Sequence, residues 1–152
     1  MVQWIETPAQ RRAIARQILE ALPEWFGIQE SRESYIQGSG DQPFWADLED
    51  GAARGFLALR ETSPYTAEVA VMGVLPEYHR LGIGRALFDA ARRYARGEGY
   101  EFLQVKTVRE GCYASYDGTN AFYHSLGFRE LECFPTLWDD ENPCQIFIMW
   151  LG

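Results

Sequence analysis

The sequence predicts an α/β fold, with antiparallel strands followed by a β-α-β-α-β unit, so that a mixed sheet carries helices on both faces. Three observations lead to this fold class. The length of 152 residues matches one domain, over residues 1–152. Turn residues such as Asp50-Gly51 and Ser63-Pro64 separate short strand-like runs in the first half, which favours a meander. In the second half, strand-like and helical runs alternate, as in crossover units.

The first elements have clear boundary signals. A short strand is expected over Val2 to Glu6. Thr7 is a good N-cap for the helix that follows, with Pro8 at the first helical position and Gln10 reaching back toward the cap. Apolar residues recur at helical spacing on one face of this helix: Ile14, Ile18 and Leu22.

The remaining elements are predicted from apolar runs and from the turn residues that bound them. Strands alternate apolar residues over short runs, and helices carry them at helical spacing and end near glycine. The expected strands are Phe44 to Glu49, Gly55 to Glu61, Tyr65 to Val74, Phe102 to Thr107, Phe128 to Phe134 and Gln145 to Trp150, with a polar loop before the last. The expected helices are Ser31 to Gln37, Arg85 to Arg96 and Asn120 to Leu126.

Composition excludes several classes of protein. Hydrophobic residues make up 47% of the chain, which argues against global disorder. The net charge of −8 argues against nonspecific binding of nucleic acid or of an anionic membrane. No basic segment precedes an apolar core at the N-terminus, so we expect no signal peptide. Cys112, Cys133 and Cys144 show no C-x-x-C spacing and are expected to be reduced thiols in a cytoplasmic protein.

A glycine loop between a strand and a helix is the strongest functional signal. Gly82 and Gly84 let the backbone approach a ligand, and the first turn of the next helix offers unpaired N–H groups and a favourable dipole. The loop is therefore expected to hold a diphosphate, through His79, Arg80, Leu81, Gly82, Ile83, Gly84 and Arg85. A Rossmann turn does not fit, because seven residues separate Val74 from Gly82. A P-loop does not fit either, because no Gly-Lys-Ser/Thr follows.

The same block, Val74 to Leu87, resembles the acetyl-coenzyme A signature of the GNAT N-acetyltransferase superfamily, Q/R-x-x-G-x-G/A. A second block, Asn120 to Phe128, is close to the family's N-x-x-x-Y-x-x-x-G-F, with one residue fewer before Tyr123. The resemblance covers roughly residues 65 to 150. His79 stands where the family has Gln or Arg, which puts a side-chain role at that position in doubt.

The resemblance implies the GNAT fold, acetyl-CoA as co-substrate, and transfer of an acetyl group to a primary amine by direct attack in a ternary complex. No His, Cys or Asp cluster has the spacing of metal ligands, so we expect no metal. The resemblance also implies roles for particular residues. Met72 and Val74 would hold the thioester arm, Asn120 would bond the pantetheine arm, and Tyr123 would protonate the departing thiolate. For Asn120 the alternative is a helix cap, and for Tyr123 a packed core residue.

Glu68 is the expected general base. In some GNAT members a carboxylate at this place accepts the proton of the amine, directly or through water. Glu68 lies six residues before Val74 and shares its face if the strand alternates without interruption. A bulge would break this parity, and a salt-bridged strand residue is the alternative.

The acceptor side is the least determined by sequence. Trp25, Phe26 and Trp138 lie in segments that combine aromatic and acidic residues. In the GNAT fold these segments flank the acceptor groove, so the resemblance implies that the three residues line it; the alternative is that they close the core over the ends of the sheet. Together with the net charge of −8, these segments favour a small cationic amine. The alternative functions are a protein or peptide N-acetyltransferase and a non-catalytic coenzyme A sensor. The sequence leaves open whether the protein forms a homodimer.

Overall fold

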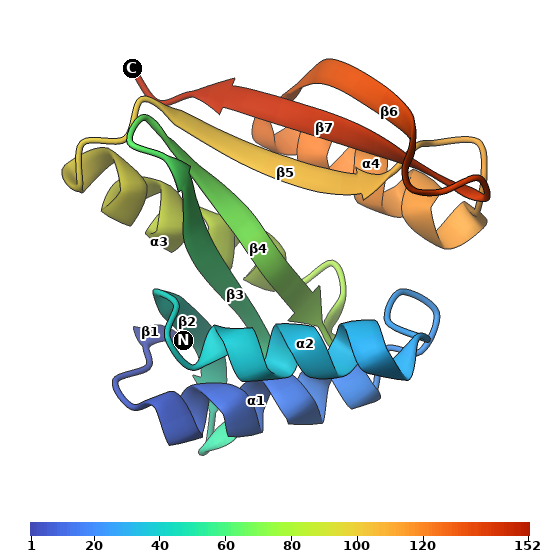
Figure 1. The fold of residues 1–152 in the computed structure, drawn as a ribbon. Coiled ribbons are helices and arrows are strands. Elements are labelled where there is room, and N and C mark those ends of the chain that lie inside the picture. Colours follow the sequence, from blue (N-terminus) through green and yellow to red (C-terminus); the bar gives the residue numbers. More distant parts are fainter.

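The computed structural model describes residues 1–152 as one mixed seven-stranded sheet with helices on both faces (Figure 1). The strand order is β1-β2-β3-β4-β5-β7-β6. All neighbouring strands are antiparallel except β4 and β5, which are parallel. This arrangement confirms the fold class predicted from the sequence.

The bounds of the elements agree with the predicted ones to within a few residues at most boundaries. The strands are β1 (Val2–Trp4), β2 (Phe44–Glu49), β3 (Ala52–Ser63), β4 (Thr66–Val74), β5 (Phe102–Val108), β6 (Arg129–Asp139) and β7 (Asn142–Trp150). The helices are α1 (Pro8–Glu20), α2 (Gln29–Ser39), α3 (Ile83–Gly97) and α4 (Ala114–Leu126), with a 3₁₀ turn at Pro76–Tyr78.

Helices α1 and α2 cover one face of the strands β1 to β4. The N-cap of α1 forms as expected: the Thr7 hydroxyl accepts a hydrogen bond from the Gln10 backbone N–H at 3.2 Å. A cluster of buried apolar residues lies between these helices and the sheet; it includes Ile18 and Leu19 of α1 and Phe56 of β3. This packing leaves the other half of the same face, over β5 and β7, without a covering helix (Figure 1).

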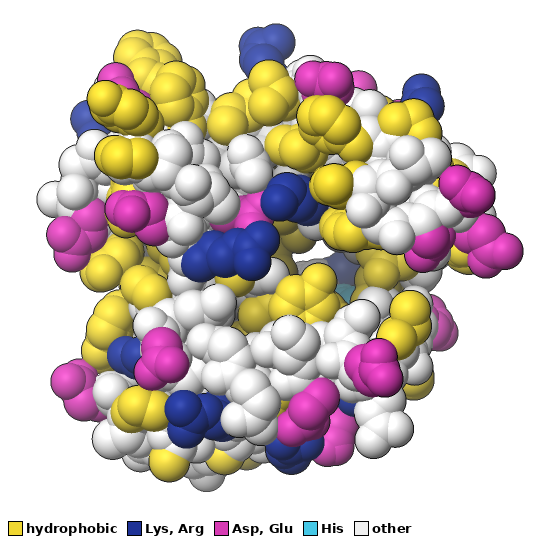
Figure 2. All heavy atoms as spheres, viewed as in Figure 1, with side chains coloured by type: hydrophobic (Ala, Val, Ile, Leu, Met, Phe, Trp, Pro, Cys, Tyr) yellow, Lys and Arg dark blue, Asp and Glu magenta, His cyan; other side chains and the backbone are white.

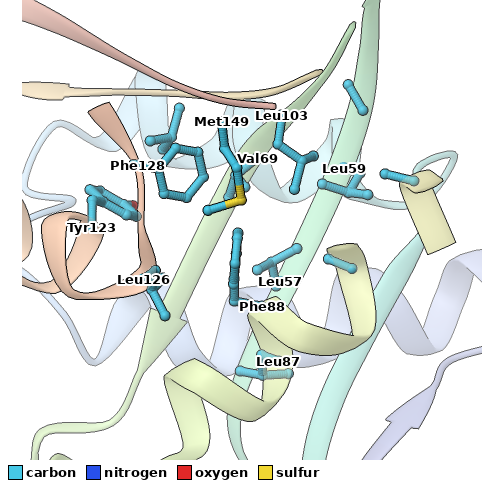
Figure 3. Packing of buried hydrophobic residues seen from close by; sticks show 14 of the residues in the cluster. Leu57, Leu59, Val69, Leu87, Phe88, Leu103, Tyr123, Leu126, Phe128 and Met149 are labelled. Atoms are coloured by element: carbon cyan, nitrogen blue, oxygen red, sulfur yellow. The ribbon is translucent and has the colours of Figure 1, made fainter. Parts of the chain in front are cut away.

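Helices α3 and α4 cover the opposite face, over the larger of the two cores. This core contains Leu87, Phe88 and Leu103, all at most 2% exposed, and it joins α3 to both halves of the sheet (Figure 3). Each fully buried aliphatic or aromatic side chain stabilises the fold by about 1.5–3 kcal/mol relative to exposure. The central helix is therefore a rigid support for the loop that precedes it.

The two middle strands separate along their length, which opens a gap in the sheet. Backbone pairing between β4 and β5 begins at Thr66–Phe102 and ends at Glu68–Gln104. Beyond that pair, the rest of β4 has no partner on the β5 side, and Figure 1 shows the two strands diverging. The backbone groups on this edge of β4 are thus free to bind something that is not part of the sheet.

The last hairpin differs from the sequence prediction. A polar loop was expected between residues 134 and 145, but the two strands continue to Asp139 and Asn142. The Asp139 carboxylate accepts hydrogen bonds from the backbone N–H groups of Glu141 and Asn142, which closes a tight turn. Polar composition here marks an exposed edge strand, since nearly every residue of β6 is exposed.

None of the helices is both long enough and apolar enough to span a bilayer.

Candidate active site

The loop before α3 has the geometry of an anion cradle. Gly82 caps α3 with φ of 80°, a left-handed conformation that favours glycine, and Arg80 also has a positive φ of 67°. No side chain caps the helix, and the first helical hydrogen bond runs from Ala86 N–H to the Gly82 carbonyl at 3.0 Å. The N–H groups of Ile83, Gly84 and Arg85 are consequently free for a ligand.

Helix α4 holds this cradle from the side. A Cβ at Gly84 would lie 3.0 Å from the Phe122 ring, so glycine permits the close approach of α3 to α4. The Arg85 guanidinium donates weakly to the Ser125 carbonyl and hydroxyl, each at 3.4 Å. Residues such as Arg80 and Leu81 remain exposed on the loop, where Arg80 can meet a phosphate. The cradle thus combines free backbone N–H groups with exposed basic side chains.

The free edge of β4 presents donors to the gap in the sheet. Leu75 N–H bonds to the Arg54 carbonyl on the β3 side at 2.9 Å. Because N–H groups alternate along a strand, those of Met72 and Val74 point away from β3 and into the gap. The Val74 carbonyl points the same way and meets His79 Nε2 at 2.8 Å. His79 thus closes the end of this edge with its side chain, a role that the sequence left open.

Tyr123 lies on α4 at the margin of the main core, beside Phe128 (Figure 3). It is 6% exposed, and burial raises the pKa of its phenol well above the usual range. The only other influence on that pKa is the neighbouring Tyr116, and no hydrogen bond to the protein contributes to it. The hydroxyl is therefore a protonated donor without a protein acceptor.

Asn120 lies one turn before Tyr123 and is 1% exposed. Its amide nitrogen donates to the Val108 carbonyl at 2.9 Å and to the Tyr116 carbonyl at 2.7 Å. These bonds join α4 to the end of β5. It is not the N-cap of α4, since that helix begins six residues earlier, at Ala114.

Glu68 does not share a face with Val74, so the parity argument for it was wrong. Val69 and Val71 pair with the consecutive residues Leu59 and Ala58 of β3, which makes Ala70 an extra residue, a β-bulge. Val74 packs against the main core under α3, whereas Glu68 points to the other face, between the core residues Ala67 and Val69. The bulge reverses the alternation between the two positions.

Glu68 is 2% exposed and both of its oxygens are engaged. Arg60 Nε donates to Oε2 at 2.7 Å and its Nη2 forms an ion pair with the same oxygen. Gln104 Nε2 donates to Oε1 at 2.9 Å, and Lys106 Nζ lies 3.3 Å from it. These four side chains form what we call the vertex cluster, because Glu68 and Gln104 are the last backbone pair before the strands separate.

The sequence reasoning missed the vertex cluster. Lys106, the single lysine of the chain, reaches the face of the sheet opposite the cradle, and no sequence motif marks it. Arg60 had no signal of its own; its partner is identified only by the strand register, which places Arg60 directly opposite Glu68. In Figure 2, Lys and Arg side chains lie beside the hollow in the middle of this face.

The three residues expected to line the acceptor groove lie in different parts of the structure. Trp25 lies between α1 and α2; its Nε1 donates to the Ser115 carbonyl at 3.3 Å, and its carbonyl accepts from the Tyr116 hydroxyl at 2.9 Å. We call these three residues the clasp, because they join the two halves across the gap. Phe26 packs edge-on against Tyr35 of α2, with ring centres 5.9 Å apart. Trp138 is 44% exposed near the end of β6.

No three His, Cys, Asp or Glu side chains are arranged to hold a metal ion. The three cysteines are free thiols.

Comparison with known proteins places the chain in a family. The model of the acetyltransferase (GNAT) family matches residues 11–128. The N-alpha-acetyltransferase RimI of Mycobacterium tuberculosis is 36% identical over 77 residues, which are 51% of this chain and 44% of that protein, so the match spans less than half the length of this relative.

Two solved structures share the fold at low sequence identity. The ribosomal-protein-S18-alanine N-acetyltransferase of Escherichia coli has a TM-score of 0.76 at 20% identity, with 100% of this chain and 94% of that chain covered. An aminoglycoside 6′-N-acetyltransferase complexed with coenzyme A has a TM-score of 0.76 at 12% identity, with 100% and 97% covered. At such identities the likeness concerns the fold alone. Since the family model covers most of the chain, the protein belongs to the GNAT acetyltransferase family, whose acyl donor is acetyl-CoA.

Proposed function

We propose that the protein is an acetyl-CoA-dependent N-acetyltransferase that acts on the primary amine of a small molecule, by direct attack in a ternary complex. One arrangement supports the proposal: the cradle at the start of α3, the free edge of β4 at the gap, and the buried Tyr123 of α4, in the core that also contains residues of α3. The cradle suits a diphosphate, the free edge of β4 suits an extended amide arm, and the Tyr123 hydroxyl suits a thiol.

The co-substrate supplies the acetyl group as a thioester. The N–H groups of Met72 and Val74 are assigned to its arm and carbonyl oxygen, where donors favour the charge that develops on attack. The Asn120 side-chain oxygen is assigned to an amide N–H of the same arm. The bond from the amine nitrogen to the acetyl carbon forms as the carbon–sulfur bond breaks.

Tyr123 is assigned to the sulfur. Its raised pKa keeps the phenol protonated through the neutral range, so the proton is present when a thiolate departs. The proton lost by the amine is assigned to water in the gap, because the oxygens of Glu68 are already engaged by three partners. Glu68 is given a positioning role instead.

A protein or peptide acceptor is the second candidate. It is favoured by the identity of 36% to a protein named as an N-alpha-acetyltransferase. The fold does not choose between the acceptors, since the two structural neighbours are named for a ribosomal protein and for an aminoglycoside. A coenzyme A sensor without turnover is disfavoured by the free hydroxyl of Tyr123, which a sensor does not need.

The test combines coenzyme binding with turnover. Calorimetry with acetyl-CoA and a thiol-release assay with a panel of amines and peptides are run on the wild type and on Gly82→Asp. The aspartate places a negative charge against the diphosphate, so binding should be lost while circular dichroism still shows a folded protein. Unchanged affinity in Gly82→Asp would reject the cradle, and release of thiol only with peptides would replace the small-molecule acceptor.

A further inference from the structure

The vertex cluster has one more positive than negative charge, and it lies on the face of the sheet opposite the cradle. Glu68 neutralises only one of the two cations, Arg60 and Lys106. Both cations remain partly open to solvent: the Arg60 side chain is 49% exposed and that of Lys106 is 27% exposed. The chain as a whole carries −8, so this local excess runs against the average charge of the molecule.

The donors of both cations are only partly used. Arg60 engages Glu68 through Nε and Nη2, and no protein acceptor meets its Nη1. Lys106 Nζ approaches one carboxylate oxygen, which leaves donors of its ammonium free. Because the two cations contact different oxygens of one rigid, buried carboxylate, they are held in place on the two sides of it.

The two titratable groups that sense the charges of the cluster, Tyr35 and Cys144, are both neutral at physiological pH. Burial raises the pKa of the Tyr35 phenol on α2, and the charges of Arg60 and Glu68 also act on it, lowering and raising that pKa respectively. Tyr35 also lines a shallow, open depression on α2 with Glu30, Ser31 and Ser34, and no residue of the vertex cluster lines it. Cys144, the other titratable neighbour of Lys106, is buried, and burial raises the pKa of its thiol to about 11, so it is neutral.

The position of the cluster relative to the free edge of β4 sets a length. Glu68 and Met72 are four residues apart on β4, with one of the intervening residues in the bulge. At the rise of a strand this is roughly 10 Å along the gap. A ligand held by Arg60 and Lys106 at the Glu68 carboxylate must span a length of this order to reach the free edge of β4.

We infer that Arg60 and Lys106, held by Glu68, bind a carboxylate of the acceptor, and that the acceptor is an amine whose carboxylate is several bonds away, as in an ω-amino acid or a dipeptide. This inference rests on the proposed function and names its substrate class. It also replaces the expectation of a purely cationic amine, which depended on the net charge of the whole chain. The charges close to the site determine which acceptor it binds, because exposed charges beyond about 10 Å are screened at physiological salt.

The experiment measures acceptor binding without turnover. With coenzyme A present, tryptophan fluorescence is titrated with ω-amino acids of three to six carbons, with the corresponding amides and with simple alkylamines. The carboxylates should bind about tenfold or more tightly than the matched amides, since hydrogen bonds to charged groups are the strong ones. Arg60→Gln and Lys106→Gln should each remove most of that preference, while Arg60→Lys should restore part of it.

Arg16→Gln is the matched control, because Arg16 pairs with Glu33 on the helices, and this ion pair involves no residue of the vertex cluster. It should leave the preference unchanged. Coenzyme A affinity and circular dichroism check that each variant is folded. Equal binding of carboxylates and amides by the wild type, or a preference that survives both substitutions, would overturn the inference.

The outcome is separable from that of the proposed function. If coenzyme A does not bind, the proposed function fails, and the same titration without coenzyme still decides whether the cluster selects carboxylates. If coenzyme A binds and thiol is released with amines, but the carboxylates show no advantage, the proposed function stands and the acceptor class does not.

Discussion

At the scale of single residues, Tyr123 concentrates the chemistry of the proposed reaction. Its position in the second family block could be read from the sequence, but the lack of a protein partner for its hydroxyl could not. That property depends on what surrounds the phenol in three dimensions, namely Phe128 and Phe147 at ring distances of 5.7 and 5.9 Å. An aromatic surrounding of this kind desolvates the phenol and offers it no acceptor.

Tyr123→Phe should therefore lower kcat by about 10² to 10⁴ if the phenol protonates the thiolate. Affinity for coenzyme A should change little, because the cradle is untouched. The measurement is steady-state thiol release together with calorimetry of coenzyme binding. A variant with wild-type kcat would make Tyr123 a packing residue.

The raised pKa of Tyr123 also fixes the sign of a pH effect. A group whose pKa is raised on folding contributes stability below its unfolded pKa, and that contribution is lost as pH rises toward the folded value. An ordinary phenol titrates near 10 and the folded Tyr123 titrates above that value, so kcat should show no decline from Tyr123 below about pH 10. A loss of rate at lower pH that is absent from Tyr123→Phe would contradict this reading.

Glu68 shows why a catalytic role was hard to assign from sequence. Its place on the strand was predicted correctly, but a single extra residue, Ala70, reversed the face on which it lies. Alternation patterns cannot reveal a bulge within a run such as Val69 to Val71, where every residue is apolar. The register of β3 against β4 was needed, and register depends on pairing far along the chain.

At the scale of elements, boundaries were predictable where a local signal exists. The cap at Thr7 and Pro8 and the left-handed Gly127 at the end of α4 lie where the sequence placed them. The start of α4 was missed by six residues, because Tyr113 occupies the N-cap position without a side-chain cap bond. Gly118 within the helix further weakens the helical signal.

Asn120 is the main polar link between α4 and the sheet. Asn120→Ala removes two hydrogen bonds at a buried position and leaves the Val108 carbonyl without this partner. Urea unfolding should show a loss of about 1–3 kcal/mol. Thr119→Ala is the matched control: it removes one hydroxyl bond within the same helix, to Ser115, and should cost less than about 0.5 kcal/mol. Equal losses in the two variants would show that Asn120 contributes nothing beyond helix propensity.

At the scale of the whole molecule, the divergence of β4 from β5 organises everything else. The order of elements could be predicted from punctuation and periodicity, because each βα unit carries its own local signals. The gap could not, since it depends on where pairing stops, and no residue type marks that point. The cradle and the vertex cluster both depend on the gap between β4 and β5. Only the cradle can be recognised from a motif in the sequence.

The clasp is a contact between the two halves across the gap, outside the sheet and the main core. Tyr116 on α4 donates to the Trp25 carbonyl on the loop between α1 and α2, residues 91 positions apart in the chain. The indole of Trp25 returns a bond to Ser115. The loop that bears Trp25 also carries Phe26 against Tyr35, so we expect the clasp to hold this loop in place beside α2.

Tyr116→Phe deletes one bond of the clasp and keeps the ring. The loss of a hydrogen bond of about 1 kcal/mol should lower global stability by that amount at most. Hydrogen exchange should become faster in residues 23–28 than elsewhere, and KM for the acceptor should rise several-fold while affinity for coenzyme A stays constant. Tyr113→Phe is the control, because the Tyr113 side chain is 43% exposed and its hydroxyl has no protein partner. If the two variants exchange alike and neither changes KM, the two halves are held by the sheet and the cores alone, and the clasp has no part in shaping the acceptor site.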